Sequence, residues 1–376
     1  MDWIAADDAL SQLSVQKQTL YAYVSRGLVR AKADDGDPRR SLYSASDVAR
    51  LKGRRRGARR RSEVAAGAIA WGEPILESAI STVRDGRLII RGQSVEALAM
   101  KSTLEDMARL LWNADGVPVQ QPIRRIQGAT PKARAFAMLA RRAAEDAPSL
   151  GRSATALRAD AWSILFEFAD TLVGEPGKGS LHQRFAKAWG LNAQGAQIIR
   201  RALVLMADHE LNPSTFAVRI AASTGAPLAA CALAGLSTLA GPLHGEAPTR
   251  ALAQLDQLTS AKDIAAEARA IIARGDAIAG WSHPLYPEGD IRAANLLAAL
   301  KPKPVIAKAL RALERETGDK PNCDAALAAM TRSLNLPDEA TFSVFALARM
   351  TGWLAHAMEQ RETGRLIRPR ARYTGA

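Results

Sequence analysis

Three histidines lie where the sequence predicts breaks between helices, and this placement makes them candidates for chemistry. His209 stands in "MADHELNPST", His244 in "LAGPLHGEAP" and His283 in "AGWSHPLYPEGDIRA". Pro and Gly around His283 predict a loop, and loops commonly hold residues that act on ligands. Imidazole titrates near neutral pH, so it can donate or accept a proton. A single such histidine is usually structural or solvated, whereas three at junctions, with Arg292 following His283, favour a polar site.

The composition predicts a globular protein in a reducing compartment. The chain has 376 residues, 48% of them hydrophobic, which allows two or three domains and a large core. Cys231 and Cys323 are far apart and lack metal-ligand spacing, so we expect neither a disulfide nor a zinc site. The acidic start is unlike a secretory signal, and Gly and Pro interrupt the uncharged run 220–243. We therefore expect a cytoplasmic protein without a membrane span, and no dinucleotide or P-loop motif is present.

Positive charge is concentrated in residues 1–61, which hold fourteen Lys and Arg against seven Asp. Much of it lies in "RLKGRRRGARRR" at 50–61, a run that alone is typical of a solvated linker. The preceding segment predicts a helix, a turn at Ser14 and Val15, a second helix ending at Gly27, a strand and a third helix opening at Ser46. Residues 3–52 thus resemble the helix-turn-helix of MerR-like regulators, which implies DNA contact, although such modules also bind proteins.

From about residue 62 onward apolar residues recur at helical spacing, so the expected fold class is mostly α. One exception is "TVRDGRLIIRG" at 82–92, where Asp85 and Gly86 predict the turn of a short hairpin. Helices are predicted at 103–113, 131–146, 154–173, 194–208, 214–224, 227–240, 249–257, 261–274, 292–300, 304–316, 323–334 and 339–360.

Four segments resemble, in their order and spacing, the signature segments of the citrate synthase family. They are "GPLHGEA", "GWSHPLYPEGDIRA", "NCDAALAAM" and "RPRARYTG". "ESAISTVRDGRLIIRGQSVEALA" at 77–99 resembles an early segment of the same family, so the similarity runs from about residue 72 to the C-terminus. The resemblance implies a two-domain helical fold behind a helix-turn-helix module at 1–61, as in a bacterial subgroup. The large domain is then expected at 62–245 and 328–376, with a small acyl-CoA-side domain at 246–327.

The resemblance also implies a reaction, the condensation of acetyl-CoA with oxaloacetate to give citrate and CoA. Asp324 is then the base that takes a proton from the acetyl methyl group. His244 donates to the thioester oxygen as the enol forms, near the positive end of a helix. His283 polarises the oxaloacetate carbonyl, and His209 hydrogen-bonds the same substrate.

Arginine forks suit the two carboxylates of oxaloacetate. The family pattern implies Arg292, Arg349 and, from the neighbouring subunit, Arg368, so we expect a homodimer or higher even oligomer with shared sites. No metal or bound cofactor is expected, because acetyl-CoA is a substrate. His182 and His356 match no family position and are left outside the site, the latter as a packing residue.

Several residues depart from the family pattern: Glu246 for a glycine, Trp281 and Ser282 for an aromatic–glycine pair, Ile291 for a proline and Ala325 for an aromatic residue. They place extra charge near His244 and alter the expected acyl pocket. Two alternatives therefore stay open. One is a 2-methylcitrate synthase that uses propionyl-CoA, and the other is a metabolite-sensing DNA-binding regulator built on a synthase fold.

Overall fold

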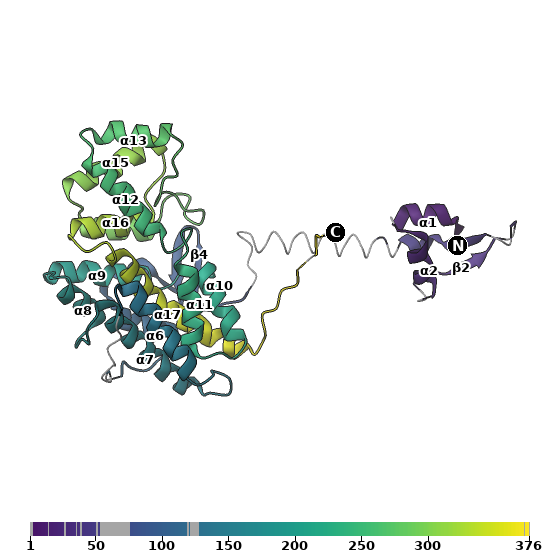
Figure 1. Ribbon diagram of the computed structural model, residues 1–376, viewed down its shortest axis with the longest axis horizontal. Coiled ribbons are helices and arrows are strands. Elements are labelled where there is room, and N and C mark those ends of the chain that lie inside the picture. Colours follow the sequence, from purple (N-terminus) through teal and green to yellow (C-terminus); the bar gives the residue numbers. More distant parts are fainter. Residues whose placement is uncertain are drawn as a thin grey trace. The chain divides into compact units, whose positions relative to one another are not determined.

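The computed structural model describes residues 3–13, 15–25, 28–34, 36–37, 40–49, 52, 76–118, 120, 128–371 and 373–375. The chain forms two compact units, Met1–Glu77 and Ser78–Ala376 (Figure 1). The predicted boundary at 61/62 lies outside the described residues. So does the basic run 50–61, apart from Lys52.

The first unit combines two short helices with a small antiparallel sheet. α1 (Ala6–Leu13) and α2 (Lys17–Ser25) flank the predicted turn, and β1 (Trp3–Ile4), β3 (Ser41–Ser44) and β2 (Ala31–Ala33) pair in that order. Residues 45–49 are helical, close to the predicted third helix. These elements enclose a small apolar core: Ala9, Leu13, Leu20, Val29, Tyr43 and Val48. The two helices, the strand β3 and the helical residues 45–49 follow the predicted order, whereas β1 and β2 were not predicted.

The second unit opens with the predicted hairpin. β4 (Ser81–Arg84) pairs with β5 (Arg87–Ile90), and β6 (Gln93–Ser94) completes the sheet. Asp85 and Gly86 have φ angles of 51° and 67°, the left-handed values that a two-residue type I′ turn requires. The hairpin leaves β4 close to the segment that carries His209, because Ser81 donates to Asp208 and the Glu210 amide donates to Ser81 at 3.0 Å.

The rest of the second unit is helical, which confirms the mostly α class. The helices are α4 (Val95–Lys101), α5 (Leu104–Trp112), α6 (Pro131–Glu145), α7 (Ala154–Val173), α8 (Leu181–Ala188), α9 (Ala193–Leu205), α10 (Pro213–Ser223), α11 (Leu228–Leu239), α12 (Ala247–Ser260), α13 (Ile264–Ala273), α14 (Ile291–Leu300), α15 (Pro304–Thr317), α16 (Cys323–Ser333) and α17 (Ala340–Thr363). α4 and α8 had no counterpart in the prediction. Asn212, Asp290 and Asn322 cap the helices that begin beside the predicted site residues.

α17 is the central helix of this unit, and from Ala340 to Met358 every residue is buried. It packs on α5, α7, α9, α10 and α11, while α12, α13, α15 and α16 gather in a second lobe (Figure 1). Gly235 of α11 permits close packing, because a Cβ there would lie 2.7 Å from Val218 and 2.9 Å from Trp353. The expected division into a large and a small domain, with boundaries at 245/246 and 327/328, stays a prediction.

Candidate active site

Two predicted histidines, distant in sequence, meet in the structure. His209 follows α9, and His283 lies on the loop before α14. Their ring centroids are 5.2 Å apart and nearly perpendicular. Tyr286 joins them, because its hydroxyl lies 2.9 Å from His209 Nε2 and its ring centroid lies 5.2 Å from that of His283. These ring contacts define the cluster.

Two arginines bring positive charge into this buried region, each with only 2% of its surface exposed. Arg292, in the first turn of α14, donates from Nε and Nη2 to the two Asp290 oxygens at 3.0 and 2.8 Å. Arg349, on α17, donates from Nε to the Met206 carbonyl at 3.2 Å. Among the described residues the other nitrogens of Arg349 have no hydrogen-bond partner. A carboxylate can therefore reach an open guanidinium edge at Arg349 and the Nη1 group of Arg292.

His244 sits between α11 and α12 and is oriented by Ser214. Its Nε2 lies 2.8 Å from Ser214 Oγ, which also donates to Asn212 Oδ1 at 2.7 Å and accepts from the Trp353 indole at 3.1 Å. Ser214 has one proton for two possible acceptors, Asn212 Oδ1 and His244 Nε2. The direction of this hydroxyl therefore decides which nitrogen of a neutral His244 carries the proton.

The backbone fixes the tautomer of His283. The Leu285 amide donates to His283 Nδ1 at 3.2 Å, so a neutral ring carries its proton on Nε2. Ser282, directly before it, has a φ of 58°, a left-handed conformation that costs a non-glycine residue about 1 kcal/mol. The Lys320 carbonyl accepts from the Ser282 amide, and Asn322 donates to the Ser282 carbonyl at 2.9 Å. These contacts hold in place the turn at Ser282, for which the resemblance predicted glycine.

Asp324 lies in the first turn of α16, behind the Asn322 cap, whose side chain accepts from the Asp324 amide at 2.9 Å. Burial raises the pKa of Asp324 to about 6; Arg292 opposes that rise and Asp290 adds to it. The Cys323 thiol lies 3.7 Å from Asp324 Oδ1. A carboxylate with this pKa is ionised at neutral pH yet basic enough to accept a proton.

One or both of these arginines act electrostatically on each histidine of the cluster and on Asp324. Burial, followed by repulsion from Arg292, lowers the pKa of His283 to about 4. Burial and then Arg349 lower that of His244 to about 4, and burial with both arginines holds that of His209 well below its ordinary value. All three imidazoles are therefore neutral hydrogen-bonding groups at pH 7.

The structure brings together six of the seven predicted site residues and leaves Arg368 apart. Arg368 is exposed on the extended segment that follows α17. His182, left outside the predicted site, is buried on α8, where burial and then Arg200 lower its pKa. It makes no contact with the cluster among the described residues.

Sequence reasoning missed a buried contact between a carboxylate and a histidine behind the cluster. Asp208 and His356 are both fully buried, with His356 Nε2 3.3 Å from Asp208 Oδ1. Asp208 precedes His209 in the chain, and its charge raises the pKa of Arg349 against the stronger effect of burial. His356 therefore has a polar partner beyond the packing role predicted for it. The only signal in the sequence was the acidic neighbour of His209.

Two of the residues that depart from the expected family pattern, Glu246 and Ala325, contact other segments of the structure. Lys132 of α6 forms an ion pair with Glu246, so the carboxylate near His244 is neutralised. Ala325 is 2% exposed, and a Cβ on Gly280 would lie 3.0 Å from the Ala325 Cβ. The loop at Gly280 thus occupies the space beside Ala325.

Metal and membrane sites find no support in the part of the chain that the structure describes. No group of three or more His, Cys, Asp or Glu side chains there is arranged to hold a metal ion. Within the same residues, every helix is too short or too polar to cross a bilayer.

Comparison with known sequences supports this combination of fold and cluster. Residues 126–370, which include all seven predicted site residues, match the family described as "Citrate synthase, C-terminal domain". The chain belongs to the citrate synthase family. The predicted recognition of that family is confirmed.

Citrate synthase relatives share the sequence over part of their length. Citrate synthase 2 of Bacillus subtilis is 34% identical over 189 residues, 48% of this chain and 51% of the relative. The 2-methylcitrate synthase of Shewanella oneidensis is 31% identical over 53% of this chain and 55% of its own. The chain thus spans about half the length of the curated relatives it matches.

Solved citrate synthases share the fold more widely. The ternary complex of the Thermoplasma acidophilum citrate synthase with carboxymethyl coenzyme A and oxaloacetate superposes with a TM-score of 0.66 at 25% identity. The match covers 81% of this chain and 94% of that one. The Thermotoga maritima citrate synthase, at 24% identity and the same TM-score, supports the fold alone.

The buried Asp324 should weaken the fold at neutral pH. Raising its pKa from 3.8 to about 6 means that the folded state holds the proton more tightly than the unfolded state. Stability therefore falls as pH rises from about 4 to about 6, by up to about 3 kcal/mol. Asp324→Asn removes this penalty and should be more stable than the unchanged protein at pH 7.5 but not at pH 4. Urea unfolding at both pH values measures it, and equal stability at pH 7.5 would contradict the burial of a charged Asp324.

Proposed function

We propose that the protein condenses acetyl-CoA with oxaloacetate and hydrolyses the resulting thioester, giving citrate and CoA. One observation carries the proposal. A cluster of buried and half-buried side chains combines two arginines, three neutral imidazoles and a carboxylate with a pKa of about 6. The relatives named citrate synthase and the solved complex with oxaloacetate and a CoA analogue support it.

Oxaloacetate is bound at the arginine side of the cluster. Arg349 offers its open guanidinium edge to one carboxylate, and Arg292 offers Nη1. His283 donates from Nε2 to the ketone oxygen, and His209, paired with Tyr286, donates to the same substrate. Because His283 is neutral, it stabilises the developing alkoxide by hydrogen bonding rather than by charge.

The methyl carbon of the acetyl group is the nucleophile. Asp324 takes a proton from the acetyl methyl group while His244 donates to the thioester oxygen, so a neutral enol forms. For His244 to donate from Nδ1, the Ser214 hydroxyl turns its proton from Asn212 to His244 Nε2. The enol carbon then bonds to the ketone carbon of oxaloacetate, and water cleaves the thioester. CoA enters and leaves as part of the substrate, so no resident cofactor or metal is required, and a cytoplasmic location suits the two free cysteines.

Acetyl-CoA is the proposed acyl donor, with propionyl-CoA as the alternative that the Shewanella oneidensis relative keeps open. A small residue at 325 suggests room for a longer acyl chain. However, the Ala325 side chain packs against the Gly280 backbone, which argues against an enlarged acyl pocket. This packing supports the shorter substrate.

Thiol release tests the reaction and the acyl preference together. With oxaloacetate present, the full chain should release CoA from acetyl-CoA, with kcat/KM about 10-fold or more above that for propionyl-CoA. The rate should fall as pH drops below about 6, because Asp324 becomes protonated. Asp324→Asn should lose about 10²- to 10⁴-fold in kcat, whereas Arg311→Gln, which changes an exposed arginine, should lose nothing. No oxaloacetate-dependent release from either thioester would refute the proposed function.

We also propose that Arg368 completes the site of a neighbouring subunit in a homodimer. Arg368 is exposed and separate from the cluster of its own chain, which supports a role in another chain. The extended backbone after α17 gives this segment the reach to contact a second copy.

Mixed dimers test the shared site. Arg368→Ala and Asp324→Ala homodimers should both be nearly inactive. Co-expression gives about half hybrids, each with one intact and one doubly defective site, so about a quarter of sites should recover. Hybrids as inactive as their parents would rule out sharing.

DNA is the proposed partner of the first unit, on the strength of its two helices, its sheet and its basic composition. Gln18 and Tyr21 are exposed on α2, the helix that would enter a major groove. Such contact would add a regulatory role to the catalytic one.

Salt dependence tests DNA contact. Affinity for duplex DNA should fall steeply between 50 and 200 mM salt, by roughly 10-fold or more, as counterion release weakens. A chain beginning at Ser78 should lose DNA binding while keeping thiol release. Failure of the full chain to shift any genomic fragment at low salt would exclude this role.

A further inference from the structure

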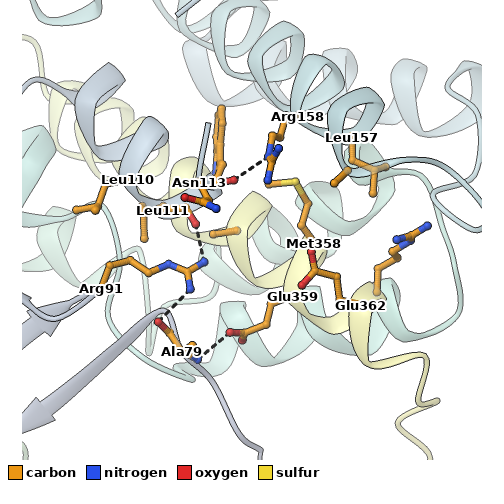
Figure 2. A pocket seen from close by; sticks show the side chains of 14 residues that line it. Ala79, Arg91, Leu110, Leu111, Asn113, Leu157, Arg158, Met358, Glu359 and Glu362 are labelled. Atoms are coloured by element: carbon orange, nitrogen blue, oxygen red, sulfur yellow. Dashed lines mark hydrogen bonds between the residues drawn. The ribbon is translucent and has the colours of Figure 1, made fainter. Parts of the chain in front are cut away.

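A cavity of about 510 Å³ lies away from the histidine and arginine cluster, where α5, α7 and α17 come together beside the β4–β5 hairpin (Figure 2). Its walls include Arg91, Arg158 and Arg361, with Leu157 and Met358 among the apolar residues. None of its lining residues belongs to the proposed catalytic site. The cavity is therefore a separate feature of the second unit.

The charge of this cavity is predominantly positive. Arg91 donates to the Ala79 and Leu111 carbonyls at 3.1 and 2.8 Å, and Arg158 Nε donates to the Trp112 carbonyl at 3.0 Å. Arg361 likewise bonds a backbone carbonyl. In the described residues, none of these three arginines forms an ion pair with a carboxylate.

The acidic residues of the lining do not cancel this charge. Glu359 is already bound, by Arg219 Nη1 at 2.8 Å and by the Ala79 amide at 2.8 Å. Glu362 is exposed at the edge. Three guanidinium groups thus face one carboxylate that lacks a partner among the described residues.

Helix capping explains part of this arrangement but not all of it. Leu111 and Trp112 end α5, so Arg91 and Arg158 satisfy carbonyls at its negative end. The terminal nitrogens of Arg158 have no partner in the described chain, and Figure 2 shows this side chain across the cavity from Arg91. An anion bound there would be neutralised by the arginines, and Leu110, Leu157 and Met358 would contact an apolar group attached to it.

The cavity is connected to the catalytic cluster by short contacts. The Arg91 amide donates to the Ile80 carbonyl at 2.8 Å, so Arg91 holds both Ala79 and Ile80. The next residue, Ser81, donates to Asp208, whose charge acts on Arg349. A displacement of Arg91 therefore shifts Ile80 and Ser81, and through Asp208 it changes the electrostatic environment of Arg349, the arginine proposed to bind oxaloacetate.

We propose that this cavity binds a small organic anion, a phosphate or carboxylate carried on an apolar group, and that its occupancy weakens oxaloacetate binding. The anion draws Arg91 away from the Ala79 carbonyl and loosens the hold of Ser81 on Asp208. The coupling rests on oxaloacetate being the ligand of the catalytic cluster, whereas binding in the cavity does not.

Calorimetric titration of the full chain with phenyl phosphate tests the binding. Phenyl phosphate should bind with a stoichiometry of one, and both inorganic phosphate and phenol should bind at least about 10-fold more weakly, because each lacks one half of the ligand. Arg158→Gln should weaken phenyl phosphate binding at least about 10-fold, and Arg311→Gln, the matched surface change, should not.

Ala154→Phe supplies a second variant, which narrows the cavity and keeps all three arginines. It should also abolish binding. Absence of binding to the unchanged protein, or binding that neither Arg158→Gln nor Ala154→Phe alters, would overturn the proposal. Strict competition between oxaloacetate and phenyl phosphate would also overturn it, because it would mean that both ligands bind one shared site.

The coupling is measured as the dissociation constant of oxaloacetate with and without saturating phenyl phosphate. It should rise at least about 5-fold, and oxaloacetate should weaken phenyl phosphate binding by the same factor. Ala154→Phe should remove the effect. An unchanged constant would overturn the effector role, while failure of oxaloacetate to bind at all would count against the proposed function instead.

Discussion

Two charged arginines inside the core are the constraint on which the rest of the second unit depends. A buried guanidinium is tolerated only with a paired charge or with hydrogen bonds. The two arginines have different stabilising partners. Asp290 binds Arg292 through both oxygens, and it also accepts from the Cys323 amide at 3.0 Å, which joins the start of α14 to the start of α16. Arg349 relies on a backbone carbonyl and on the nearby charge of Asp208. The residues that balance the arginines therefore also fix the helices that carry the site.

The positive charge of the two arginines also shifts the pKa values of the neighbouring histidines and of Asp324. Burial alone lowers the pKa of the histidines, and the arginines lower it further. For Asp324 the two effects oppose each other, so burial raises its pKa only to about 6. A site without the arginines would hold a carboxylate that is protonated more readily at neutral pH. The pKa values of the three histidines and of Asp324 thus depend on one electrostatic source.

The sequence predicted the parts of the fold that local patterns encode. The Asp85–Gly86 hairpin turn and most long helices followed from turn chemistry and periodicity, while the short α4 and α8 lacked a long enough pattern. Histidines at helix junctions identified the cluster, and the family resemblance supplied Asp324. The partners Ser214, Tyr286 and Asp208 were missed because side-chain hydrogen bonds between distant segments leave no periodic signal. His356 illustrates the limit, since an apolar helix gives no indication that a carboxylate lies opposite.

The complete burial of α17 from Ala340 to Met358 has a consequence for motion. Amide groups in such a helix become exposed only when the surrounding core opens, so α17 belongs to the part of the protein with the highest opening free energy. Arg349 lies in the middle of α17, so we expect its backbone to share this protection. The loop of His283, which has exposed prolines and a strained Ser282, is instead held by individual hydrogen bonds such as the one from Asn322 to the Ser282 carbonyl. We therefore expect the His283 loop to open locally at a lower free energy than α17.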